Sequence, residues 1–132
     1  MRNVTQILVP VAGKGSHDEL RSRLLSSLYR NGPVSCKIVF LKILPEQFST
    51  EDVERERRAL EILSRDEVPS IPIIRIQQSS RIVPTITRLA DESDLLVLGL
   101  QRFGRRRKLF GQIAFEILQQ TDCPTILISH RG

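Results

Sequence analysis

The sequence is poor in the residues that build metal clusters, disulfide frameworks and aromatic platforms. It contains no Trp, one Tyr and five Phe, and its only two cysteines, Cys36 and Cys123, lie in separate apolar stretches. Without a second cysteine pair at metal-ligand spacing, buried free thiols are favoured over a zinc site or a disulfide. Free thiols persist in a reducing compartment, so we expect a cytoplasmic protein.

Long hydrophobic runs are missing as well. No apolar stretch approaches the roughly 18 residues that a membrane span requires. Residues 1–4 lead directly into a strand-like run, which leaves no room for a secretory signal. The chain has 132 residues, of which 40% are hydrophobic and 27% charged, and we expect a single domain over residues 1–132.

Two kinds of hydrophobic segment alternate along the chain. Short β-branched runs predict strands at residues 7–11, 36–44, 73–76, 94–100 and 123–129. Apolar residues at helical spacing predict helices between them, beginning near Ser16, Ser49, Arg81 and Phe110. This alternation predicts an α/β fold, in which a doubly wound five-stranded parallel sheet carries helices on both faces. Ligands of such sheets bind where the strand order reverses, so the segments after the first and fourth strands are the candidate site.

Local signals refine this prediction. Ser16 with Glu19, and Ser49 with Asp52, have the spacing of capping boxes at helix starts. Residues 54–58 carry charges of both signs at short spacing, which indicates a solvated helix face. Prolines just before residues 73–76 favour an edge position for that strand.

Three pieces of the sequence together resemble one family over essentially the whole chain. They are Ile7 to Val11, Asp94 to Gly99, and the ending from Phe110-Gly111 to Cys123-Pro124, and in this order they resemble the universal stress proteins. The resemblance implies the strand order 3-2-1-4-5. It also implies a homodimer through the last strand, Pro124 to Ser129.

The nucleotide motif that the resemblance implies is largely missing. Nucleotide-binding members carry an Asp after the first strand and, after the fourth, a glycine, two residues, a glycine, nine residues, and a glycine followed by Ser or Thr. Here Ala12 replaces the Asp, Arg102 the second glycine and Gln112 the hydroxyl residue. Gly99 and Gly111 match the outer glycines, although one residue closer together. Ordinary ATP binding is therefore not favoured.

A basic segment stands where the glycine loop would be. Five of the seven residues from Arg102 to Lys108 are cationic, and a helix start follows them. Arginine forks and helix N-termini both bind phosphate oxygens, so we expect a site for an anion such as an adenine nucleotide, a cyclic dinucleotide or a lipid headgroup. A solvated basic loop is the alternative. The candidate contacts are Ala12, Gly13, Lys14, Gly99, Arg102, Arg105, Arg106, Arg107, Lys108, Gly111 and Gln112.

Catalysis and nucleic-acid binding are not favoured. Ser16, His17 and Asp18 are consecutive at a helix start, so their side chains diverge and form no catalytic relay. Asp91 and Asp94 bracket a helix end and a strand start, where turn chemistry explains them. Phe103 is the only aromatic residue among the loop cations, so a base-stacking platform is missing. We expect no enzyme and no metal site.

The segments around Gly99 and Gly111 are most similar to the stress-protein domains at the cytosolic ends of membrane transporters, such as amino-acid permeases, cation–chloride cotransporters and antiporters. This likeness implies a regulatory domain that senses a ligand or docks on the membrane part of a transporter. Two alternatives stay open, a purely structural dimerisation module and a stand-alone stress protein that binds ATP or another adenine nucleotide.

Overall fold

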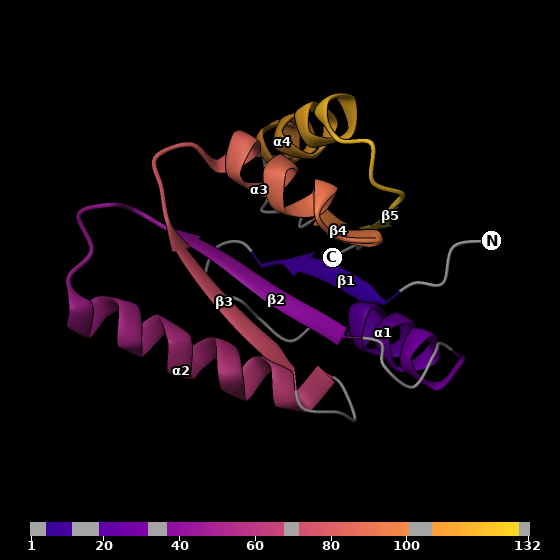
Figure 1. The fold of residues 1–132 in the computed structure, drawn as a ribbon, viewed down its shortest axis with the longest axis horizontal. Helices are drawn as coiled ribbons and strands as arrows, with labels where there is room; N and C mark the ends of the chain where they lie inside the picture. The colour runs from indigo at the N-terminus through magenta and orange to yellow at the C-terminus, as the bar shows by residue number, and fades with distance from the viewer. Residues whose placement is uncertain (1–4, 12–18, 32–36, 68–71, 101–106, 130–132) are drawn as a thin grey trace.

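Strands and helices alternate strictly along the chain (Figure 1). The computed structural model describes residues 5–11, 19–31, 37–67, 72–100 and 107–129. Within these ranges the elements are β1 (Gln6–Pro10), α1 (Glu19–Asn31), β2 (Lys37–Leu44), α2 (Thr50–Glu67), β3 (Ile73–Gln78), α3 (Ile82–Asp91), β4 (Leu95–Leu100), α4 (Arg107–Gln120) and β5 (Thr125–Ser129). No helix in these ranges is both long enough and apolar enough to cross a bilayer.

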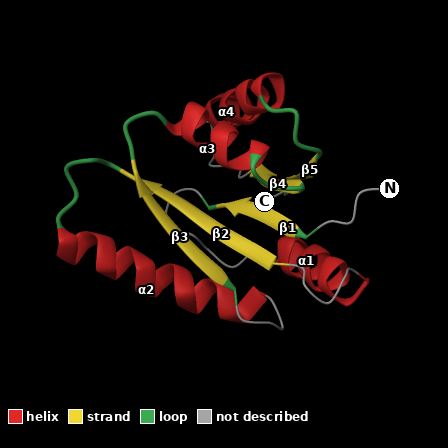
Figure 2. Cartoon of the chain, in the orientation of Figure 1, coloured by secondary structure: helices red, strands yellow, loops and turns green. Residues whose placement is uncertain are grey.

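The five strands form one parallel sheet in the order β3-β2-β1-β4-β5 (Figure 2). This confirms the predicted fold class and strand order. β3 lies at one edge, as its flanking prolines predicted, and β5 lies at the other edge.

The central strand supplies side chains to two separate cores because successive residues of a strand point to opposite faces. Ile7 and Val9 pack with Leu25 of α1 and Leu60 of α2, whereas Leu8 packs with residues of α3 and α4 such as Ile86 and Ile117. Helices α1 and α2 therefore cover one face of the sheet, and α3 and α4 cover the other.

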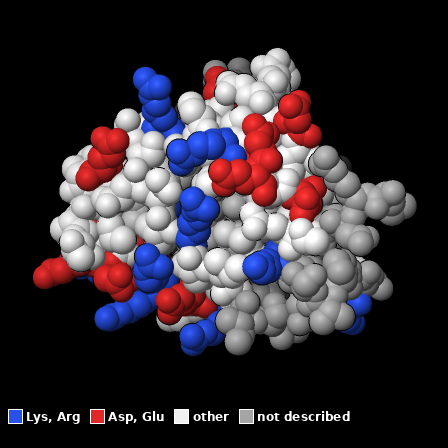
Figure 3. Space-filling model, in the orientation of Figure 1, with Lys and Arg blue, Asp and Glu red and all other residues white. Residues whose placement is uncertain are grey.

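Helix α2 has a solvated, charged outer surface, as the sequence predicted. Side chains of both signs lie over α2 in the space-filling view (Figure 3). Arg55 pairs with Asp52 and Arg57 with Glu54, both at a spacing of i,i+3. A shorter pair, 2.7 Å from Lys42 Nζ to Glu56 Oε2, ties the helix to β2.

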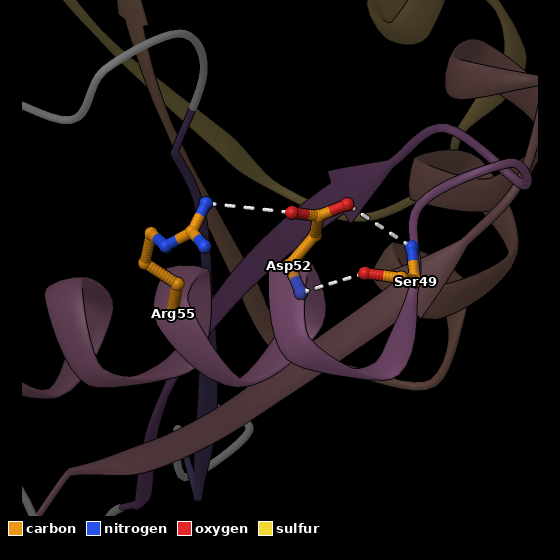
Figure 4. A network of polar contacts seen from close by, with 3 residues as sticks. All are labelled: Ser49, Asp52 and Arg55. Carbon is orange, nitrogen blue, oxygen red and sulfur yellow. Dashed lines mark hydrogen bonds and ion pairs between the residues drawn. The ribbon is translucent and has the colours of Figure 1, made fainter.

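The start of α2 is the capping box that the sequence predicted (Figure 4). The Asp52 backbone N–H donates to Ser49 Oγ over 3.2 Å, and the Ser49 N–H donates back to Asp52 Oδ2 over 3.2 Å. The Ser49 backbone and hydroxyl bonds, with a smaller contribution from the Arg55 charge, hold the pKa of the Asp52 carboxyl below its usual value. A carboxylate at a helix N-terminus also complements the helix dipole.

Several boundaries differ from the sequence prediction. Helix α4 already includes Arg107, three residues before the predicted start at Phe110, because Arg, Lys and Leu are all good helix formers. Arg107 and Lys108 are therefore helical and not part of a loop. Cys123 lies before β5 and is half-buried rather than buried, and its thiol donates to the Ser93 carbonyl. Cys36 lies outside the described residues.

Asp94 fastens the amino end of β1 to the amino end of β4. Its Oδ2 accepts hydrogen bonds from the Thr5 N–H at 3.0 Å, the Thr5 hydroxyl at 2.7 Å and the Gln6 N–H at 3.0 Å. Asp91 similarly accepts the Thr121 hydroxyl at 2.7 Å. Both carboxylates are structural, which agrees with their interpretation as turn residues.

We expect Asp94→Ala to lower the free energy of unfolding by about 2 kcal/mol, because it leaves two backbone N–H groups of β1 without their charged acceptor. Urea denaturation followed by circular dichroism measures the change. The matched control is Asp122→Ala, an exposed carboxylate of the neighbouring loop, which should shift stability by less than about 0.5 kcal/mol. Equal losses in the two variants would contradict the assigned role of Asp94.

Candidate functional site

The strand order reverses beside β1. From β1 the chain proceeds to β2 and β3 on one side, and then returns to place β4 on the other side of β1. β1 and β4 are direct neighbours, with Ile7 opposite Leu95 and Leu8 opposite Leu96. The segments that follow Pro10 and Leu100 therefore leave adjacent strands at the same side of the sheet, where the carboxyl ends of the strands lie. This is the position at which doubly wound sheets bind ligands.

The structure describes part of the predicted site. Gly99 lies within β4, opposite Ile128 of β5. Arg107 and Lys108 form the first turn of α4, and Gly111 and Gln112 lie farther along the same helix. The remaining candidates, Ala12, Gly13, Lys14, Arg102, Arg105 and Arg106, lie outside the described residues.

The first turn of α4 carries positive charge, which is unfavourable at the N-terminus of a helix. The free N–H groups of a first turn present partial positive charge, which favours acidic side chains. Helix α2 follows this rule, with Glu51 and Asp52 in its first turn. Helix α4 has no acidic residue in its first turn, which begins with Arg107 and Lys108. A conflict between local sequence and local structure is typical of functional positions, and here a bound anion would resolve it.

Asp91 and Asp94 have structural partners. Both residues lie near the amino ends of the strands, whereas the predicted site lies at the carboxyl ends. Their carboxylate oxygens accept structural hydrogen bonds. Within the part of the chain that the structure describes, no three His, Cys, Asp or Glu residues are grouped closely enough to hold a metal ion.

Sequence reasoning missed one feature of the surface, an open hollow of about 470 Å³ along the first turns of α2. It is lined by Thr50, Glu51, Glu54, Arg55 and Arg58. The spacing of these residues could have shown that they share one helix face. None of the candidate anion-site residues lines it, and its two carboxylates are balanced by two guanidinium groups, so the hollow is separate from the predicted anion site.

Comparisons with known proteins were made by sequence and by structure. No protein-family model matches the chain, and a search of curated protein sequences found no match. Solved structures do match it. A universal stress protein from Archaeoglobus fulgidus superposes with a TM-score of 0.68 at 19% identity, covering 96% of this chain and 94% of that one. The universal stress protein UspA from Lactobacillus plantarum gives 0.65 at 17% identity, with 97% and 99% covered.

A third match is a universal stress protein crystallised in complex with cAMP, with a TM-score of 0.65, 15% identity, and coverage of 97% of this chain and 98% of that one. All three matches extend over nearly the whole chain. The chain therefore has the fold of the universal stress proteins, which confirms the resemblance at the level of structure.

We expect Lys108→Glu to raise the free energy of unfolding by about 0.5 kcal/mol in a low-salt buffer without added anions, because it replaces a cation in the first turn of α4 by a residue that the helix dipole favours. Arg88→Glu is the matched control, since Arg88 lies in the last turn of α3, where a cation is favourable. That variant should lose a comparable amount. A loss in both variants would contradict the unfavourable placement of Lys108.

Proposed function

We propose that this chain is a non-catalytic regulatory domain that binds a small phosphate-bearing ligand, a mononucleotide or a cyclic dinucleotide, beyond the carboxyl ends of β1 and β4. The observation that carries this proposal is the cationic first turn of α4 at the point where the strand order reverses. Arg107 and Lys108 weaken an isolated helix start, whereas phosphate oxygens bound there would be stabilised by the side-chain charges and the helix N–H groups together.

The substitutions in the family motif favour a ligand other than Mg-ATP. Ala12 removes the carboxylate after β1, and Gln112 removes the hydroxyl of α4. Arg102 places a bulky cation where a glycine would let a triphosphate approach the backbone. A cation in place of the central glycine suits a compact anion held by side chains. The neighbour in complex with cAMP supports a cyclic nucleotide as one such ligand.

The proposal includes a homodimer through β5. This strand is an open sheet edge, and Leu127 on it is 45% exposed. Phe115 and Leu118, one turn apart on α4, are also exposed. Leu127 lies opposite Leu98, whose side chain packs in the core under α3 and α4, so it points to the α4 side of the sheet. A second copy paired edge to edge would cover this apolar surface and remove the open edge.

In this proposal the bound anion changes how the dimer contacts a partner protein. The membrane part of a transporter is favoured as that partner, because residues 98–111 are similar to transporter-attached domains. No chemical step is required of the domain. The Asp91 and Asp94 carboxylates already accept structural hydrogen bonds, which supports a binding role over an enzymatic one.

The direct test is thermal unfolding of the purified domain with ATP, AMP, cAMP and cyclic dinucleotides. A ligand at 100 times its dissociation constant should add about 2.7 kcal/mol to the folded state. We expect one cyclic or monophosphate ligand to stabilise the domain more than ATP does. Replacement of Arg105, Arg106 and Arg107 together by Ala should abolish the stabilisation.

The matched control replaces Arg55, Arg57 and Arg58 of α2 by Ala, which removes the same charge from a surface outside the proposed site. This variant should keep the ligand response. Stabilisation by ATP alone would favour the ATP-binding alternative, and no response to any ligand would favour the dimerisation module.

The dimer has an independent test. Leu127→Asp places a charge on the proposed interface and should convert the dimer to a monomer in sedimentation velocity. Ile62→Asp is the control, because Ile62 on α2 is 63% exposed and lies away from β5. A wild-type chain that sediments as a monomer would refute the interface, as would a Leu127 variant that stays dimeric.

A further inference from the structure

The edge opposite β5 is also open. β3 is the last strand on its side of the sheet, and each of its residues is at least partly exposed, in contrast to the buried centre of β1. The Ser79 N–H donates to the Leu44 carbonyl of β2, so the backbone groups of Ile73, Arg75 and Gln77 point the same way, toward β2. The N–H and C=O groups of the alternate residues Ile74, Ile76 and Gln78 therefore point outward. Within the described ranges no strand pairs with these outward-pointing groups.

Apolar side chains border this open backbone. Ile73 lies opposite Val39, which packs in the core under α3 and α4, so Ile73 points to that face of the sheet. There α3 packs mainly over β1 and α4 over β4, and Ile73 stays 42% exposed. Ile82, the first residue of α3, is 45% exposed. An open edge with exposed isoleucines is a surface on which an added strand buries apolar area.

The charge of this surface selects the partner. Arg75 points to the same face as Ile73, is exposed, and forms no ion pair with any other residue of the described segments. Basic side chains run in a rough column across this view of the molecule, with acidic side chains on both sides of it (Figure 3). A second copy joined through antiparallel β3 strands would bring the two Arg75 side chains near each other, which is unfavourable. An acidic partner is favoured instead.

We propose that the β3 edge binds an extended segment of another protein, in which acidic residues alternate with apolar ones, as a sixth strand. The backbone of Ile74, Ile76 and Gln78 supplies the hydrogen bonds of the new strand. Because its residues alternate, the added strand places its acidic side chains on the α3 side, where one carboxylate pairs with the Arg75 guanidinium. Its apolar side chains lie on the opposite face, beside Ile74 and Ile76. This surface is separate from the anion site and from the β5 edge.

The test uses a capped synthetic peptide, acetyl-Val-Glu-Val-Glu-Val-Glu-amide, added to the full 132-residue chain labelled with ¹⁵N. We expect saturable shifts of the amide signals of Ile74, Ile76 and Gln78, and slower hydrogen exchange at these outward-pointing N–H groups. A peptide with Lys in place of Glu should bind at least about tenfold more weakly. Arg75→Glu should weaken the acidic peptide by about tenfold, and Arg58→Glu, an exposed arginine of α2, should leave its affinity unchanged.

Three results would overturn the proposal. They are acidic-peptide shifts confined to residues outside β3, equal affinity for the acidic and basic peptides, and equal effects of the Arg75 and Arg58 substitutions. β3 amide signals that shift with protein concentration alone would assign the edge to a second copy of this chain instead. Urea denaturation of the Arg75 variant confirms that any loss of binding is not a loss of folding.

Discussion

The burial of β1 between two parallel neighbours is the constraint on which the rest of the structure depends. Ile7 and Val9 are fully buried on one face and Leu8 is 2% exposed on the other, so both faces of the strand must be covered by helices. Right-handed crossovers allow this only if the chain builds outward on one side of β1 and then returns to build on the other. The reversal of strand order is therefore a consequence of burying β1. It also creates the place where the ends of β1 and β4 lie side by side.

Most of the fold could be predicted from the sequence because each buried strand is a short apolar run between turn residues. The ends of strands that depend on hydrogen bonds to a neighbouring strand could not be predicted in this way. β3 extends through Gln77 and Gln78 because its ladder with Ile43 and Leu44 continues beyond the last apolar residue, and the Gln78 amide donates to the carbonyl of Phe48. A hydropathy pattern cannot predict that polar residues at the end of a strand belong to it, because only their backbone hydrogen bonds place them there.

The candidate site was only partly predictable for the same reason. The basic segment and the glycines are visible in the sequence, but the placement of Arg107 and Lys108 in a first helical turn is not, since it depends on where α4 begins. The proposed anion site depends on that placement, because cations at this position oppose the helix dipole unless an anion is bound. The hydrogen bonds between Asp94 and Thr5 could not be predicted either, since the two residues are 89 positions apart in sequence.

The measurement that tests the central claim most directly is a titration of the ¹⁵N-labelled chain with inorganic pyrophosphate, followed by amide chemical shifts at low ionic strength. Pyrophosphate carries the proposed ligand chemistry without a base or sugar. We expect saturable shifts concentrated in the first turn of α4 and at the carboxyl ends of β1 and β4. Shifts spread evenly over the exposed arginines, or concentrated at the hollow of α2, would contradict the central claim.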